Sequence, residues 1–316
     1  MAAKKSRRLS FIVIALGIAT PALAGPPRSG LADAIPLHYQ ESLIKLGFPS
    51  PLLRATVSGQ QGWFIIDTGA GVHAFASWFV SAARLKPRQT PGTVTGSTGE
   101  SENHLAMVES TVLRLEGDRE LKLREAVVLE FPKIFAEQRI AGLLSPQLLA
   151  GPHSAAVLDL RVPKLRFEPL DTAVEILKRE HRMISTGSRA CRNPESPFEN
   201  RQYAASIRVN GIDGTMLVDS GATGTVAFPN SRIVLGLQSD ASGTNRTQGV
   251  GGTVQTMRTM SGVRLERGGT TATVNLTIGG AAPGCGSDGL LGMDALRQCV
   301  LVLGNTFAWF CDAPSR

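Results

Sequence analysis

Two short stretches of this sequence place an acid where it could take part in chemistry. Asp67 begins the sequence Asp-Thr-Gly-Ala after the apolar run 63–66, and Asp219 begins Asp-Ser-Gly-Ala after the apolar run 216–218. Each apolar run predicts a buried strand, and the glycine after it predicts a tight turn. A carboxylate at the end of a buried strand costs free energy unless its neighbours satisfy it or it has a function. These two acids are therefore the candidate site residues.

A pair of carboxyl groups that shares one proton can hydrolyse a peptide bond without a metal or a nucleophilic side chain. The ionised carboxylate takes a proton from a water molecule, and the neutral carboxyl donates one to the carbonyl oxygen. At about 3 Å both groups cannot be ionised, so their titration steps separate. The two pKa values belong to the pair, and we assign no separate acid and base roles.

The acid turns are part of a longer repeat within the chain. Each acid is followed by a glycine-rich loop, then by an apolar segment around a glycine, and then by an apolar strand. Four features in the same order indicate an internal duplication. The matching ranges are 92–100 with 247–253, 141–145 with 288–292, and 157–160 with 300–303.

Alternating and apolar patterns predict mostly strands, at 52–57, 107–115, 121–129, 155–160 and 164–167. One helix is predicted at 171–181, which has an acid near its start and basic residues at its end. The polar, Pro- and Gly-containing stretch 185–200 indicates a linker. The predicted organisation is a signal peptide (1–24), a flexible leader (25–34), a first lobe (35–170), a helix and linker (171–200), and a second lobe (201–316).

From about residue 35 onward, the chain resembles the aspartic peptidases of the retropepsin-like or pepsin-like superfamily, in a two-lobed bacterial exported form. The resemblance rests on the two acid turns, each with its glycine-rich loop and apolar-glycine segment. It implies a mainly all-β fold of two pseudo-symmetric β-barrel lobes, with a central cleft and few short helices. It also implies that Asp67 and Asp219 are catalytic, that the substrate is a peptide or protein, and that no cofactor or metal takes part.

The resemblance extends to the neighbours of the acids. Thr68 and Ser220 are similar to the family's hydroxyls that bond across the lobe interface. Gly69 and Gly221 let backbone approach the carboxylates closely, because glycine has no Cβ. Alanines 70 and 222 occupy positions where digestive pepsins usually carry Ser or Thr, so we expect higher carboxyl pKa values and a milder acid optimum than pepsin has.

Two glycine-rich loops are candidates for a substrate-binding flap, because glycines permit a tight turn and an opening motion. The second-lobe loop resembles the retropepsin flap, and the first-lobe loop would be a second flap. Neither carries the tyrosine of pepsin-like flaps, and the alternative is that one or both are ordinary hairpin tips. The candidates are Gly96, Gly99, Gly249, Gly251 and Gly252.

The N-terminus predicts export. Basic residues at 4–8 precede an apolar run at 11–19, and Ala-Leu-Ala at 22–24 predicts cleavage after Ala24. The run is too short to span a bilayer, so we expect a periplasmic or secreted protein without a stable membrane anchor. The segment carries four basic and no acidic residues, so cleavage lowers the net charge from +7 to +3. No basic patch with interleaved aromatics occurs, which argues against nucleic acid as a partner.

The four cysteines are compatible with disulfides after export. A hairpin pattern between Cys299 and Cys311 favours that pair, and Cys285 with Cys299 is the alternative. The spacing of the cysteines and the scattered positions of the histidines argue against a zinc site.

Two other functions fit the sequence less well. A non-catalytic peptide-binding module with the same fold is disfavoured by acids in both halves, and a serine or metal hydrolase by the absence of Gly-x-Ser-x-Gly and His-Glu-x-x-His. His73 is predicted to be a surface or packing residue, and Trp63 and Trp309 to lie in the core or an interface. Because one chain carries both acids, we expect a monomer.

Overall fold

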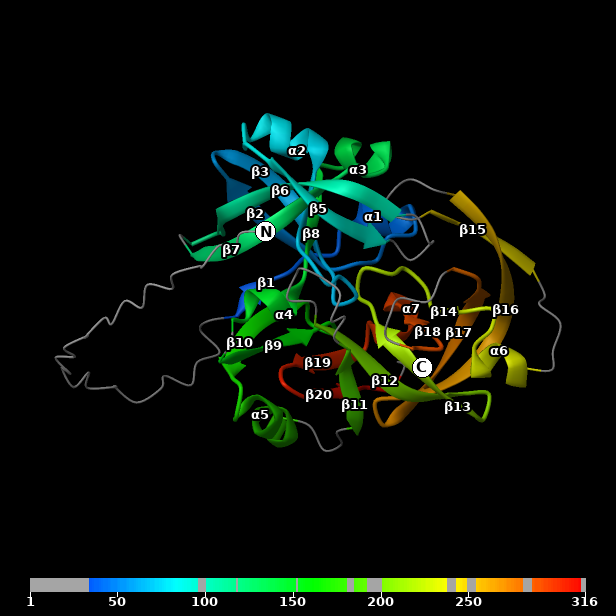
Figure 1. Ribbon diagram of the computed structural model, residues 1–316. Helices are drawn as coiled ribbons and strands as arrows, with labels where there is room; N and C mark the ends of the chain where they lie inside the picture. Colours follow the sequence, from blue (N-terminus) through cyan, green and yellow to red (C-terminus); the bar gives the residue numbers. More distant parts are fainter. Residues whose placement is uncertain are drawn as a thin grey trace, which may run out of the picture. The chain divides into compact units, whose positions relative to one another are not determined.

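The computed structural model describes residues 34–95, 101–117, 119–151, 153–180, 185–191, 201–237, 243–248, 254–280 and 286–313. All of them belong to one compact unit, Ala34–Arg316. This unit consists mainly of strands with a few short helices (Figure 1). The predicted fold class, a mainly β protein with two barrel-like lobes, is confirmed. The predicted signal peptide lies outside the described residues.

The first barrel is a seven-stranded sheet in the order β2-β3-β8-β4-β7-β6-β5, and a further pairing of β2 with β6 closes it. This pairing covers part of the edge of β2, where unpaired backbone groups would otherwise be open to other chains. The strands are β2 (Leu52–Val57), β3 (Gln60–Ile66), β4 (Ala74–Ala76), β5 (Arg88–Thr95), β6 (Ser101–Arg114), β7 (Glu120–Leu129) and β8 (Ile140–Leu144).

The second barrel repeats the first strand for strand, in the order β12-β13-β18-β14-β17-β16-β15, and a pairing of β12 with β16 closes it. Each strand is ten places further along the chain than its counterpart, so the duplication extends to the topology. The strands are β12 (Gln202–Val209), β13 (Ile212–Val218), β14 (Val226–Ala227), β15 (Gly243–Gln248), β16 (Val254–Arg267), β17 (Thr270–Ile278) and β18 (Gly289–Leu291).

A third set of strands joins the two halves in the order β1-β10-β9-β19-β20-β11. At its centre β9 and β19 run antiparallel, with Val157 opposite Val302. The hairpin assigned by sequence to the end of the first lobe therefore pairs with the second half of the chain. The strands are β1 (Ile35–Pro36), β9 (Ser154–Asp159), β10 (Lys164–Pro169), β11 (Ser185–Cys191), β19 (Cys299–Leu303) and β20 (Phe307–Cys311).

Strand β11 lies where the sequence indicated a linker. It pairs with β20 on one side and with β12 on the other, so it connects the shared sheet to the second barrel. The linker interpretation is wrong for these seven residues. The polar composition of these residues gave no strand pattern. They form a strand because their backbone groups pair with strands that are distant in sequence.

The predicted helix is present as α5 (Ala173–Glu180). Its buried residues Ala173 and Leu177 form one apolar cluster with Val157 of β9 and Val300 of β19, so α5 covers one face of the shared sheet. The other helices are α1 (Glu41–Lys45), α2 (Ser77–Ala82), α3 (Lys133–Glu137), α4 (Pro146–Leu149), α6 (Arg232–Gly236) and α7 (Met293–Leu296).

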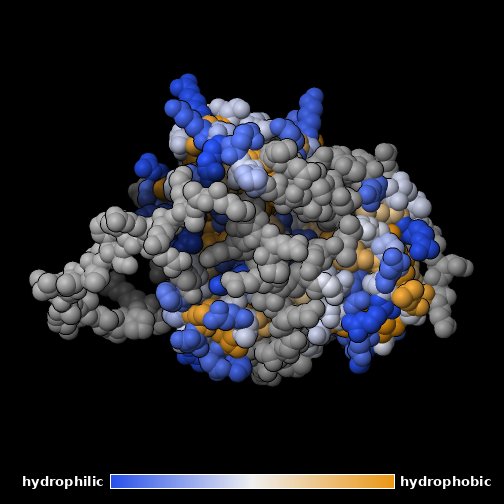
Figure 2. All heavy atoms as spheres, viewed as in Figure 1, coloured by the Kyte–Doolittle hydropathy of each residue, from blue (hydrophilic) through white to orange (hydrophobic). Residues whose placement is uncertain are grey.

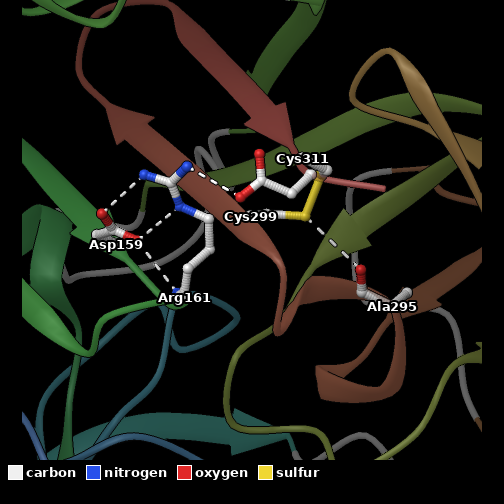
Figure 3. The surroundings of a disulfide bond; sticks show 6 residues. Asp159, Arg161, Ala295, Cys299 and Cys311 are labelled. Atoms are coloured by element: carbon white, nitrogen blue, oxygen red, sulfur yellow. Dashed lines mark hydrogen bonds and ion pairs between the residues drawn. A yellow bond between two sulfur atoms is a disulfide. The ribbon is translucent and has the colours of Figure 1, made fainter. Parts of the chain in front are cut away.

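A disulfide joins Cys299 of β19 to Cys311 of β20, which is the pairing that the hairpin pattern favoured (Figure 3). Beside it, Arg161 bonds Asp159 through two nitrogen atoms, both at 3.0 Å, and Asp312 through a third at 3.1 Å. The disulfide and the ion pairs thus fasten the chain's last strand to the middle of the shared sheet.

Exposed hydrophobic side chains are few and scattered in the described part of the chain. On the face shown in Figure 2 they form small groups among hydrophilic residues. The large ones are Leu46, Val112, Val162 and Leu235. Within the described ranges, no helix has the length and apolar character that a membrane span requires.

Candidate active site

Each acid stands at the end of the strand that sequence predicted for it. Strand β3 runs parallel to β8, and the backbone N–H of Asp67 donates to Leu144 O at 2.9 Å. Strand β13 runs parallel to β18, and the N–H of Asp219 donates to Leu291 O at 3.0 Å. The apolar-glycine segments are therefore the neighbouring strands that hold the acids in place.

Glycine is required in these neighbouring strands because another strand lies close against each of them. A Cβ atom at Gly142 of β8 would lie 2.1 Å from Ala74 O, and one at Gly289 of β18 would lie 2.0 Å from Val226 O. Both distances are shorter than any van der Waals contact. The motif glycines thus allow the barrel to close tightly behind each acid.

Each carboxylate is oriented by its own turn. Asp67 Oδ1 accepts hydrogen bonds from the N–H groups of Gly69 and Ala70, at 2.8 and 3.0 Å. Asp219 Oδ1 accepts from the corresponding two residues, both at 2.9 Å. One oxygen of each carboxylate is thereby occupied, and the side chain is fixed before any ligand arrives.

The two acids meet, one from each barrel. A side-chain hydrogen bond joins the carboxyl groups of Asp67 and Asp219. Each carboxyl also packs against the opposite turn, since a Cβ at Gly69 would lie 2.4 Å from Asp219 Cγ and one at Gly221 would lie 2.5 Å from Asp67 Cγ. Both acids are half-buried, so water reaches them.

The environment raises the pKa of both carboxyl groups. Burial has the largest effect on Asp67, and the charge of Asp219 and the hydrogen bond between them add to it, so its pKa lies well above the ordinary value. Burial also raises the pKa of Asp219, although its hydrogen bond with Asp67 and those that it accepts from the N–H groups of Ala222 and Gly221 oppose this effect. The pair therefore holds one proton where free aspartates would have lost theirs.

Two hydroxyls lock the turns together. Thr68 Oγ1 donates to Val218 O at 2.8 Å and accepts from the Ser220 N–H at 3.0 Å. Ser220 Oγ donates to Ile66 O at 2.6 Å and accepts from the Thr68 N–H at 3.1 Å. Neither Thr68 nor Ser220 is exposed to solvent. The four hydrogen bonds therefore form a symmetric, buried network between the two barrels.

Three further side chains support the turns, and sequence analysis did not single them out. Gln147 Nε2 donates to Thr68 O and Ala70 O, both at 3.1 Å, and to Arg201 O at 2.7 Å. Gln202 Nε2 donates to Gly69 O, and Ser50 Oγ to Gly221 O at 3.3 Å. A signal was present, because Ser50 and Gln202 are separated by the same 152 positions as the two acids.

His73 lies near the first turn as a buried packing residue, with 6% of its surface exposed. Its Nδ1 accepts a hydrogen bond from the Ser145 N–H at 3.1 Å. Burial lowers the pKa of His73 to about 4, so its imidazole is neutral over most of the acid range. Among the other predicted core residues, Trp309 is fully buried and Trp63 is half-buried.

The five candidate flap glycines lie outside the described residues. Strands β5 with β6 and β15 with β16 are the hairpins that lead to them. In the described part of the chain, no group of three or more His, Cys, Asp or Glu side chains is arranged to hold a metal ion.

The sequence matches the profile of the aspartyl protease family twice, over residues 53–146 and 205–295. The two matches together span more than half of the chain, and each contains one acid turn with its apolar-glycine segment. The chain belongs to the aspartyl protease family.

Comparison with solved structures finds a similarity to basic 7S globulin from soybean. The sequence identity is 11%, the TM-score is 0.47, and the similarity covers 88% of this chain and 94% of the globulin. No curated protein sequence matches.

Proposed function

We propose that this chain is an exported aspartic endopeptidase that uses Asp67 and Asp219 as a catalytic pair. The observation that carries the proposal is the direct hydrogen bond between two half-buried carboxyl groups with raised pKa values, one from each barrel. An aspartyl protease fold does not need two acids in contact for its stability alone. Holding them together is costly, and peptide hydrolysis is the chemistry that such a pair performs.

In the proposed reaction, the carboxyl pair begins with one proton. The ionised carboxylate takes a proton from a water molecule as the water oxygen bonds to the peptide carbonyl carbon. The neutral carboxyl gives its proton to the carbonyl oxygen, which produces a tetrahedral diol. The C–N bond then breaks as the amine nitrogen takes up a proton and a hydroxyl proton returns to the pair. The products are a carboxylic acid and an amine, and the pair again holds one proton.

Export is part of the proposal. A disulfide between β19 and β20 is a cross-link that persists in oxidising compartments. It agrees with the signal peptide predicted at residues 1–24, and a periplasmic or secreted monomer is the proposed active form. N-terminal sequencing of the exported protein tests this, and a mature chain beginning at Gly25 is the expected result.

The catalytic proposal is tested with Asp67→Asn and Asp219→Asn. Each variant is expected to lose about 10²–10⁴-fold in kcat, because one of the two proton transfers has no group to carry it. The control is Asp213→Asn, an exposed carboxyl on β13 of the second barrel. Circular dichroism checks that all three variants fold.

Turnover at the wild-type rate by either dyad variant would contradict the mechanism. A wild-type chain that binds peptides but cleaves none would instead support the alternative, a protease-like peptide-binding module. Inhibition by pepstatin-type compounds, without inhibition by chelators or serine reagents, is the expected inhibitor profile of the active enzyme.

A further inference from the structure

Two cavities occupy positions in the two halves that are related by the internal duplication. The first-lobe pocket has a volume of about 440 Å³, and the second-lobe pocket has a volume of about 580 Å³. Their walls are built from corresponding residues of the two halves. The pairs include Val72 with Gly224, Gln147 with Asp294, and Arg201 with Pro49, with the residue of the first-lobe pocket named first.

Both pockets begin directly beside the acid turns. In the first-lobe pocket, Gln147 bonds the backbone of the Asp67 turn and also the carbonyl of Arg201. In the second-lobe pocket, Met293 next to Asp294 donates its N–H to Ala222 O at 2.9 Å. A peptide that runs extended across the acid pair would carry its side chains toward the pockets on either side of the cleaved bond.

The charges of the two pockets differ, although their positions correspond. Lys122, Arg124 and Arg201 line the first-lobe pocket together with a single acid, Glu125. Asp294 is the only charged side chain among the described residues of the second-lobe pocket, whose other polar groups are hydroxyls and an amide. Among the described lining residues, positive charge therefore gathers in the first-lobe pocket and is missing from the second-lobe pocket.

Two of these cations are available to a ligand. Lys122 is exposed and Arg201 is half-buried, and neither forms an ion pair with another described residue. Lys122 comes from β7 of the first barrel and Arg201 stands just before β12 of the second, so the two barrels each contribute one cation to the pocket. A carboxylate between them would gain two charge-assisted contacts.

We propose, on the basis of the catalytic function proposed above, that the first-lobe pocket binds an acidic side chain of the substrate. The substrate class is a peptide with Asp or Glu to one side of the cleaved bond, and Lys122 and Arg201 are the specificity-determining residues. This contact would fix the direction in which the peptide chain binds, because the corresponding pocket of the other half offers no cation among its described residues.

The test uses sets of synthetic peptides that differ only by Glu, Gln or Lys at one position on either side of the cleaved bond. Wild type is expected to prefer Glu to Lys at one position, and the preference should appear mainly in KM. Lys122→Glu and Arg201→Glu should each reduce this preference about fivefold, and the double variant should reverse it. Lys133→Glu, an exposed lysine that lines neither pocket, should leave the preference unchanged.

Two conditions distinguish charge recognition from an indirect structural effect. The preference for Glu should weaken at high ionic strength, because salt screens partly exposed charges. It should also fade as the pH drops below about 4, where the peptide's carboxylate becomes protonated. Arg201→Gln gives a milder variant in case the charge reversal does not fold.

The results that would overturn the pocket assignment differ from the results that would overturn the catalytic proposal. An active enzyme with no acidic preference at any position, or with a preference that the double variant retains, would overturn the pocket assignment. The binding of the Glu and Lys peptides to the Asp219→Asn protein is measured as well. An inactive wild-type chain whose peptide binding still depends on Lys122 and Arg201 would reject catalysis and keep the assignment.

Discussion

At the scale of residues, the carboxyl pair links the stability of the fold to pH. Both pKa values are raised in the folded protein, so the folded state binds more protons than the unfolded chain at pH values above about 4. Under this linkage the pair's contribution to stability is present at low pH and is lost as the pH rises through the folded-state pKa. An acidic working range would therefore suit both the proposed chemistry and the fold.

Asp67→Asn is predicted to stabilise the protein at pH 7, because it removes a buried group that resists ionisation. The expected gain is about 1.4 kcal/mol for each unit by which the wild-type pKa is raised, and it should vanish near pH 4. Urea unfolding of both proteins at several pH values measures it. Asp171→Asn, which removes an exposed carboxyl outside the barrels, is the control, and equal stability of Asp67→Asn and wild type at all pH values would show that the pair is not perturbed.

Under the proposed mechanism, the same pair sets the pH dependence of activity. Cleavage needs one ionised and one neutral carboxyl, so the rate should fall when the pair loses its shared proton. Because Ala70 and Ala222 add no hydroxyl bond to the carboxylates, the pH–rate profile is predicted to peak at a milder pH than that of pepsin. A maximum below about pH 3 would contradict this.

His73 has the opposite effect on stability. Its pKa is lowered from 6.5 to about 4 in the folded protein, so its contribution is present above pH 6.5 and is lost as the pH falls toward 4. His73→Asn keeps an acceptor for the Ser145 N–H and is predicted to remove about 3 kcal/mol of this pH dependence. Urea unfolding between pH 4 and pH 7 measures the change, and His153→Asn controls for the loss of an exposed histidine.

At the scale of elements, the two acid turns act as one unit. Their hydroxyl network is fully buried, so each lost bond leaves a donor or acceptor that water does not reach. Residue positions within each turn are fixed by the partner turn as much as by their own strand. The geometry of the acid pair therefore depends on both halves folding together.

Thr68→Val tests this dependence. Valine has nearly the shape of threonine but leaves the Val218 carbonyl and the Ser220 N–H without a partner, so a loss of about 2–4 kcal/mol in unfolding free energy is expected. Thr68→Ser is the matched control, because the second turn already uses serine at this position. Equal stability of the valine variant and wild type would mean that the network contributes nothing.

At the scale of the whole molecule, the shared sheet makes the halves interdependent. Strands β9 and β19 lie at its centre, and their pairing joins the first half to the second through four residue pairs. Each half alone would expose these strand edges and the apolar surface beneath α5. Exposed edges of this kind promote aggregation.

Residues 34–180 and 185–316 are therefore predicted to be insoluble when produced separately and to form a soluble 1:1 complex when produced together. Size-exclusion chromatography of the co-expressed halves measures this outcome. Soluble, monomeric and cooperatively unfolding halves would show that each barrel is stable without the shared sheet.

The sequence alone was sufficient for features that depend on short-range pattern. The acid turns, the strands around them, helix α5 and the internal duplication are all readable because apolar periodicity and turn residues act over a few positions. The repeat also predicted that Asp67 and Asp219 would belong to corresponding places in two lobes. Their mutual contact agrees with that expectation.

Other features were decided only by the tertiary structure, because they depend on contacts between residues far apart in the chain. Polar residues 185–191 became a strand through pairing with β20 and β12, and the hairpin of β9 and β10 joined the second half. Gln147 became a support of the acid turn, and Lys122 and Arg201 came to line one pocket from two barrels. A local sequence pattern does not predict these contacts, because each of them joins residues that are far apart in the chain.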